Sequence, residues 1–155
     1  MIQLKRSSSG SYELTDKKQV VKLKEKTISL GEYQINTPGE YEQGGVEVIY
    51  SQSAALLVWD HLQIAYIFEA TKPDAFEKNQ FSSTDVLLLS EEIKEISKDQ
   101  LTMLIDSYDP RAVIISSQTE IEKSYKENIK PLEQSPIKLS AQALPVEGRD
   151  YLILS

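Results

Sequence analysis

Short apolar stretches alternate with polar residues through the first third of the chain, and a period of two is typical of half-buried strands. Breaks rich in Ser, Gly, Asp and Lys separate these stretches. The pattern therefore predicts a meander of hairpins. The expected strands are residues 2–5, 12–14, 20–24, 27–30, 33–35 and 46–50.

Longer apolar runs follow in the middle and end of the chain. Two β-prone runs at residues 54–59 and 62–68 flank Asp60 and His61, and this arrangement predicts a hairpin with a two-residue turn. Continuous apolar runs without alternation are typical of strands that are buried on both faces. The further expected strands are residues 85–89, 112–115, 137–141 and 151–154.

Two helices are expected between these later strands. Ser97 and Gln100 have the spacing of a capping box, and Pro110 ends the helix that this box opens. A second capped helix is predicted to begin near Thr119. The side chains expected to point inward are Leu101, Leu104 and Ile105 in the first helix and Ile121, Tyr125 and Ile129 in the second. Hairpins followed by strand-helix units predict an α/β domain with helices on one face of a sheet, and no repeat or linker divides residues 1–155 into more than one domain.

The amino-acid composition excludes several kinds of functional site and several classes of protein. Of 155 residues, 40% are hydrophobic and none is cysteine, which excludes disulfides, thiolate zinc sites and cysteine nucleophiles. No apolar run approaches the roughly 18 residues of a membrane helix, and the start MIQLKRSSSG lacks the apolar centre of a signal peptide. We therefore expect a cytoplasmic protein without a membrane partner.

Charge is unevenly distributed along the chain. The net charge is −7, which makes nucleic acid an unlikely partner, but residues 1–26 carry +4 and the remainder carries −11. One interpretation is that the lysines within residues 1–26 keep an edge of a sheet solvated and so discourage further strands from pairing with it. The other is a basic interaction face for an acidic protein surface, which could belong to a second copy. The residues of this face would be Lys17, Lys18, Lys22, Lys24 and Lys26.

The most distinctive segment is PGEYEQGGVEV, at residues 38–48. It resembles the PGEYE-then-GV segment of bacterial metallo-β-lactamase-fold proteins of the UlaG-like, metal-dependent hydrolase group. The order of the later hairpin and strands is similar as well. The resemblance implies a truncated metallo-β-lactamase-like layered fold, mainly β in its N-terminal half with strand-helix units in its C-terminal half. The residues of this fold motif are Pro38, Gly39, Glu40, Tyr41, Gly44 and Gly45.

One part of the family pattern is missing. In that family a histidine-rich HxHxDH loop precedes the PGEYE segment, whereas residues 24–34 here, KEKTISLGEYQ, contain no histidine. The aspartate that follows the family's hairpin falls near Ala70, and its later histidine falls near Ser116 or Ser117. The resemblance therefore implies a pseudoenzyme with no catalytic residues, no cofactor-binding residues and no metal ligands.

The remaining residues offer little else for catalysis. A catalytic zinc needs about three nitrogen or carboxylate ligands, and the single histidine, His61, is expected in an exposed turn. Asp106 and Asp109 are more typical of a helix end than of an ion site. Ser116 lacks a neighbouring base in the sequence pattern, and Gly44 with Gly45 precedes a strand where a phosphate-binding loop would precede a helix. Trp59 is expected in the core.

We expect a non-catalytic domain that acts through association, either as a homo-oligomer or as a subunit of an assembly. A small-ligand-binding module in the former active-site cleft is an alternative, and so is a hydrolase whose metal site is completed by a partner chain. Thermal stabilisation by a metabolite would favour the ligand module, and stoichiometric metal with chelator-sensitive hydrolysis would favour the enzyme.

Overall fold

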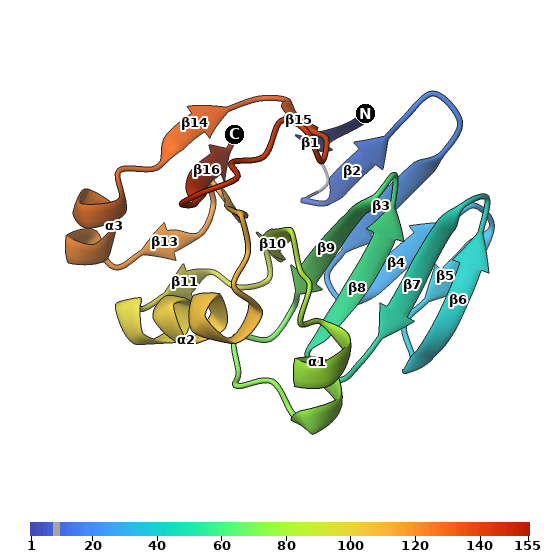
Figure 1. The fold of residues 1–155 in the computed structure, drawn as a ribbon, viewed down its shortest axis with the longest axis horizontal. Helices are drawn as coiled ribbons and strands as arrows, with labels where there is room; N and C mark the ends of the chain where they lie inside the picture. Colours follow the sequence, from blue (N-terminus) through green and yellow to red (C-terminus); the bar gives the residue numbers. More distant parts are fainter. Residues whose placement is uncertain (8–9) are drawn as a thin grey trace.

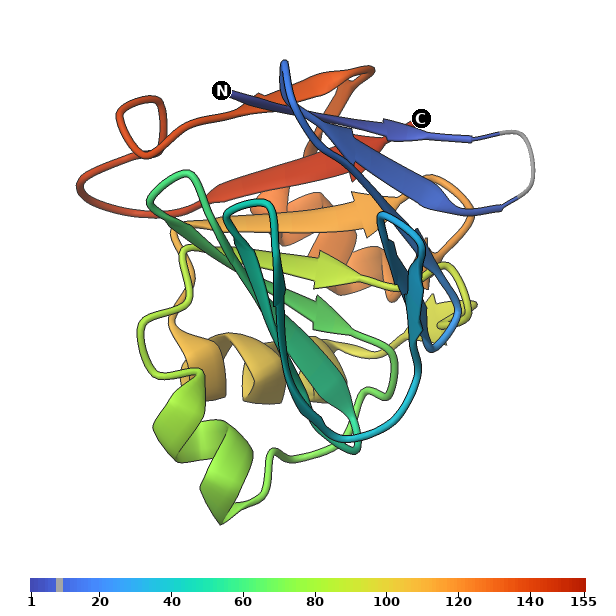
Figure 2. The same ribbon diagram turned by 90° about the vertical axis from the view of Figure 1, so that its right-hand side faces the viewer.

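The fold has three layers, and helices cover only one of its two outer faces. The computed structural model describes residues 1–7 and 10–155. Figure 1 shows the helices below and to the left of a long sheet, and Figure 2 shows this sheet between the helices and the blue strands of the N-terminal part. The order of layers is thus sheet, sheet, helices, which is one of the few ways to bury both faces of a central sheet.

The outer layer is a six-stranded antiparallel sheet built mainly from the N-terminal meander. Its strands, in spatial order, are β15 (Ile137–Leu139), β1 (Ile2–Arg6), β2 (Tyr12–Thr15), β3 (Val20–Lys24), β4 (Thr27–Leu30) and β5 (Tyr33–Ile35). Buried and exposed residues alternate along β3, as expected for a sheet with one face on the core. The predicted meander is confirmed, and β15 joins it from the far end of the chain.

The central layer is an eight-stranded mixed sheet. Its strands, in spatial order, are β14 (Leu132–Gln134), β16 (Asp150–Leu154), β12 (Ala112–Ser116), β10 (Val86–Leu89), β9 (Leu62–Ile67), β8 (Ala54–Trp59), β7 (Val46–Tyr50) and β6 (Gly39–Gln43). Pairing is parallel from β14 through β9 and antiparallel from β9 to β6. Every residue of β10 and β12 is buried, because both faces of these strands are covered.

The helices lie on the face of the central sheet that points away from the outer sheet. They are α1 (Ala75–Gln80), α2 (Lys98–Tyr108) and α3 (Lys123–Ile129), and a two-stranded parallel sheet of β11 (Glu95–Ile96) and β13 (Glu120–Ile121) lies among them. The capping box at Ser97 and Gln100 is confirmed, with the side chain of each residue bonded to the backbone of the other. In the described part of the chain, no helix is long and apolar enough to cross a membrane.

Two expectations for the helices are wrong or incomplete. Thr119 does not cap α3, because its hydroxyl donates to the carbonyl of Ile93 and the chain first forms β13. The residue before α3 is Glu122, whose side chain makes no capping bond. Helix α1 was not expected, although Asp74 and Glu77 form a capping box at its start. Burial of Tyr125 on α3 is as predicted.

Separate apolar clusters fill the two spaces between the layers. The first contains the inward side chains of both sheets, and the second contains the other face of the central sheet together with α1, α2 and α3. Trp59 is buried as expected, and its Nε1 donates to the carboxylate of Asp16 at 3.0 Å. Among the helices and strands of residues 1–7 and 10–155, none covers the outer face of the six-stranded sheet.

Candidate functional site

The carboxyl ends of the parallel strands β9, β10 and β12 meet at one edge of the central sheet, called the strand-end edge below. Leu89 pairs with Ile67, and Leu88 pairs with Ile114, so the three strands end at the same level. Open α/β sheets bind their ligands outside such ends. Ser116, one of the positions matched to a family metal ligand, ends β12 at this edge, and the chain leaves β9 towards Ala70 here as well.

Aromatic rings fill the space between the sheets behind the strand-end edge. Tyr12, Tyr66, Phe68 and Tyr50 are each at most 5% exposed. Phe68 stacks on Tyr50 with ring centroids 5.3 Å apart, and it meets Tyr66 edge-on at 6.0 Å. Tyr66 in turn meets Tyr12 edge-on at 6.3 Å. These arrangements are favourable for aromatic pairs and leave little room for solvent among the rings.

The tyrosine hydroxyls tie two other elements to this edge. Tyr66 donates to the carbonyl of Glu25 at 2.6 Å, and Tyr50 donates to the carbonyl of Lys26 at 2.5 Å. Both acceptors belong to the turn between β3 and β4. Tyr12 donates to the carbonyl of Leu89 at 2.6 Å. The outer sheet and its β3–β4 turn are therefore fastened over the strand ends by hydrogen bonds from buried side chains.

Burial raises the pKa of all three of these hydroxyls, and of Tyr12 and Tyr66 most. For Tyr12, loss of solvation is the largest cause, and the nearby carboxylate of Glu91 adds to the increase in pKa. For Tyr66, loss of solvation again raises the pKa most. Both side chains are therefore held in the neutral, donating form well above the pH at which an exposed tyrosine ionises.

A buried ion pair occupies the strand-end edge itself. Glu91, which follows β10, accepts hydrogen bonds from the Nε of Arg6 and from the hydroxyl of Ser116, the latter at 2.7 Å. Glu91 is 7% exposed and Ser116 is fully buried. Both donors bond to Oε1, and a carboxylate held by a guanidinium and a hydroxyl is stabilised in place.

The side chains at the strand-end edge do not fit a catalytic zinc ion. Such an ion needs about three nitrogen or carboxylate ligands with an open position for water. The matched positions are Ala70, Ser116 and Ser117, and the carboxylate that bonds to Ser116, that of Glu91, is also bonded to Arg6. Among residues 1–7 and 10–155, no group of three or more His, Cys, Asp or Glu side chains is arranged to hold a metal.

Two shallow hollows remain beside the edge. One, of about 210 Å³, lies between the β3–β4 turn and the residues after β10. The other, of about 350 Å³, lies over the outer faces of β3, β4 and β5. They share Lys24 and Glu25, and their other lining side chains are polar or charged, with Gly10 as the exception. The two hollows are thus open and polar, whereas small-molecule sites are usually concave and apolar.

The residues singled out from the sequence lie apart from this edge or take structural roles. His61 and Asp60 form an exposed turn, with φ of 62° and 52°, at the start of β9, about 20 Å along the strand from its carboxyl end. Asp109 is the C-cap of α2 and accepts a hydrogen bond from Arg149 at 2.8 Å, whereas Asp106 is exposed.

The five lysines of the predicted basic face lie in one line along β3. Lys17 and Lys18 are in the turn before the strand, Lys22 and Lys24 point outward from it, and Lys26 follows it. Lys26 pairs with Glu69 at 2.9 Å, and this hydrogen bond raises the pKa of the lysine. The four other lysines extend over the uncovered face of the outer sheet and its turn.

The PGEYE segment builds the edge strand β6 and the tight turn into β7. Tyr41 packs against the core between the sheets, and its hydroxyl donates to the carbonyl of Thr37 at 2.9 Å. Gly44 and Gly45 form the turn with φ of 61° and 86°. Glu42 accepts from the backbone N–H of Gly45, and Glu40 is exposed, as expected for turn and surface carboxylates. Pro38 precedes the strand in a bend.

Gly39 is required by the position of the Tyr41 ring. Its φ is +155°, and a Cβ there would lie 3.2 Å from the Tyr41 hydroxyl and 3.4 Å from the ring. We therefore expect Gly39→Ala to lower the free energy of unfolding by more than about 1 kcal/mol, because alanine is strained in this conformation. Urea unfolding measures the change. Gly148→Ala is the control for backbone strain alone, since its φ is +79° but no atom lies within 4 Å of the added Cβ; an equal loss in both variants would contradict the role of Tyr41.

Arg6, Glu91 and the aromatic cluster were not recognised from the sequence. A weak signal existed, because Ser90, Glu91 and Glu92 directly follow the fully apolar strand β10. Polar residues at the end of a buried strand are candidates for a site in an α/β sheet. Arg6, the partner of Glu91, lies 85 residues away from it in sequence, and no local pattern connects these two residues.

Comparisons with known proteins show the fold of this chain but not its function. No protein-family model and no curated protein matches the sequence. Among solved structures, the chain is similar to the crystal structure of a proposed Zn-dependent hydrolase of the metallo-β-lactamase superfamily from Thermotoga maritima. The two chains are 10% identical and superpose with a TM-score of 0.73 over 99% of this chain and 98% of that chain. The expected metallo-β-lactamase-like fold is therefore confirmed, and the two chains have a similar extent.

Proposed function

We propose that this chain is a non-catalytic metallo-β-lactamase-like domain that acts through association with protein, either a second copy or another subunit. The arrangement of side chains at the strand-end edge supports the non-catalytic part of this proposal. Arg6 and Ser116 both donate to the carboxylate of Glu91 there, and buried aromatic rings fill the space behind them. A reaction that used Oε1 of Glu91 would require breaking its partly buried ion pair with Arg6, which is unfavourable.

The uncovered face of the outer sheet supports the association part of the proposal. All three described helices lie on the other side of the central sheet (Figures 1 and 2). The face carries lysines in regular alternation along β3, where Lys22 and Lys24 point away from the core. A surface on which basic side chains outnumber acidic ones favours an oppositely charged protein surface and steers its approach.

Native mass spectrometry of the purified protein, with elemental analysis for zinc, manganese and iron, tests this function. We expect a metal-free complex, either of several copies or with a copurified protein. One or two equivalents of tightly bound metal, with hydrolysis abolished by a chelator, would overturn the non-catalytic part. A species that stays monomeric and without any bound protein at high concentration would overturn association.

A small-ligand module is the second candidate, and the two hollows that meet at Lys24 and Glu25 favour it. A ligand that binds the native state raises its thermal stability. A metabolite that raises the melting temperature in a concentration-dependent way, with loss of the effect in Lys24→Gln, would move this candidate to first place.

A further inference from the structure

The outer face of the six-stranded sheet is basic, although the protein as a whole is acidic. The outward side chains include Lys5, Lys22, Lys24 and Lys138, which together are called the basic sheet face, and one acidic residue, Glu13. Of these lysines only Lys5 forms an ion pair within the described part of the chain, with Glu13 at 3.6 Å. These four lysines and Glu13 together carry +3. Because the whole chain carries −7, all other residues together carry −10.

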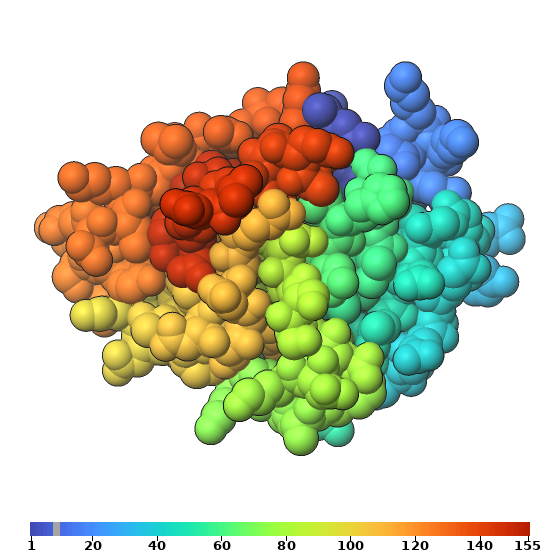
Figure 3. Space-filling model, in the orientation of Figure 1, coloured from blue at the N-terminus to red at the C-terminus, as the bar shows by residue number. Residues whose placement is uncertain are grey.

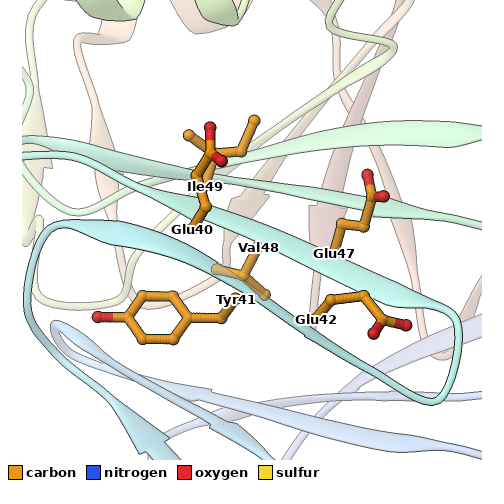
Figure 4. A pocket seen from close by; sticks show the side chains of 6 residues that line it. All are labelled: Glu40, Tyr41, Glu42, Glu47, Val48 and Ile49. Atoms are coloured by element: carbon orange, nitrogen blue, oxygen red, sulfur yellow. The ribbon is translucent and has the colours of Figure 1, made fainter.

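A compact acidic surface lies on the β6–β7 hairpin. Glu42 and Glu47 are directly opposite each other in the strand register, and Glu40 is the next outward residue of β6. These three carboxylates, called the acidic hairpin, line a hollow of about 270 Å³ that has Ile49 and Val48 as apolar lining and no basic side chain (Figure 4). Like charges directly opposite each other are destabilising, so this hairpin would gain stability from a cationic partner.

The two charged surfaces face in opposite directions. Inward residues of β7, such as Val48, pack between the sheets, so Glu47 on the same strand points to the helix side of the molecule. Glu40 and Glu42 share that side, because the register pairs them with Ile49 and Glu47. Figure 3 shows β6 and β7, in cyan, open to the viewer beside the light-green α1. The basic sheet face lies on the far side of both sheets.

The spacing of the charges on the two surfaces is the same. Lys22 and Lys24 are two residues apart on β3, and Glu40 and Glu42 are two residues apart on β6. In both strands this places the side chains about 7 Å apart on one face. A strand of one copy laid along a strand of another could therefore form both ion pairs at once.

We propose that the basic sheet face docks the acidic hairpin of a second copy, so that copies join head to tail. This inference rests on the proposed function of association and names its partner. Because the two surfaces differ and point in opposite directions, the contact is heterologous, and a dimer keeps one free basic sheet face and one free acidic hairpin. Further copies can therefore add to either end. Nucleic acid would meet the same lysines, but the −10 charge of the rest of the molecule repels it.

Sedimentation velocity over a range of concentrations tests the contact. At about 50 mM salt, wild-type protein is expected to form species larger than a dimer, and at about 500 mM salt these are expected to dissociate, because exposed ion pairs are screened. The double variants Lys22→Gln/Lys24→Gln and Glu42→Gln/Glu47→Gln are each expected to weaken association by about tenfold or more. The variant Lys123→Gln/Lys126→Gln, on the exposed side of α3, removes the same two positive charges as Lys22→Gln/Lys24→Gln does. It should associate like the wild type.

Mixing the two double variants gives the sharper result. Each retains one half of the contact, so an equimolar mixture is expected to form a one-to-one dimer and no larger species. Wild-type protein that is monomeric at low salt but copurifies with a different protein would overturn this inference and leave the proposed function standing. Association that persists in both double variants would also overturn it. If the basic-face variant instead loses binding to DNA or to anionic vesicles that wild-type monomer binds, the occupant is another polyanion and the inference is wrong.

Discussion

Replacing Arg6 with methionine is expected to lower the free energy of unfolding by about 3–5 kcal/mol, because it leaves the buried carboxylate of Glu91 without its cation. The side chains of Arg6 and Glu91 are 21% and 8% exposed, so solvent does little to compensate for a lost partner. Denaturant unfolding followed by tryptophan fluorescence of Trp59, which lies in the core between the sheets, measures the change.

A double variant separates the cost of a buried charge from a simple loss of packing. Arg6→Met/Glu91→Gln leaves neither partner of this ion pair charged and is expected to recover a large part of the loss. Lys5→Met is the matched control, since Lys5 is half exposed and pairs with Glu13 at 3.6 Å, and it should change stability by less than about 1 kcal/mol. If Arg6→Met were as mild as Lys5→Met, the ion pair would not be what holds this edge closed.

Raising the pH above 10 is expected to destabilise the fold steeply. Burial raises the pKa of Tyr12 and Tyr66, so both keep their protons in the folded protein at a pH where they ionise in the unfolded chain. Their contribution to stability is complete below the tyrosine pKa of the unfolded chain, about 10, and is lost as the pH rises towards the raised pKa of the folded state. The expected slope is about 1.4 kcal/mol per pH unit for each of these tyrosines, and Tyr108 adds to it because burial raises its pKa as well.

Phenylalanine variants assign this slope to particular residues. Tyr66→Phe should reduce the slope by the share of one tyrosine, in addition to a loss of about 1 kcal/mol at neutral pH for the hydrogen bond to the carbonyl of Glu25. Tyr33→Phe is the control, because Tyr33 is 62% exposed and should leave the slope unchanged. Urea unfolding at a series of pH values from 8 to about 11 gives the slope; equal slopes in the wild type and Tyr66→Phe would show that Tyr66 is not held neutral by burial.

Elements with strong local signals were predicted well. The hairpin turn at Asp60 and His61 follows from two apolar runs separated by two residues, and helix α2 follows from Ser97, Gln100 and Pro110. Such signals depend on residues within a few positions of one another, so the chain needs no tertiary context to express them.

Elements that depend on distant partners were missed or misplaced. Ile121 fits a helical pattern but lies in β13, because the backbone there pairs with β11. Helix α1 has only six residues, and it is held by Glu77, which is 2% exposed and accepts hydrogen bonds from the backbone N–H and the hydroxyl of Ser53. A short helix is marginal by itself, so its stability comes from this contact with a residue 24 positions away.

By itself, the sequence determined the layered α/β fold, the absence of a histidine-rich loop and the uneven charge, because these are properties of composition and of local pattern. Only the tertiary structure decided which side chains meet at the strand-end edge. It joined Arg6 to Glu91 and Tyr66 to Glu25, and it placed the lysines of β3 on a face that no helix covers. These contacts arise from the packing of one sheet on the other, and packing depends on the shapes of side chains that are far apart in sequence.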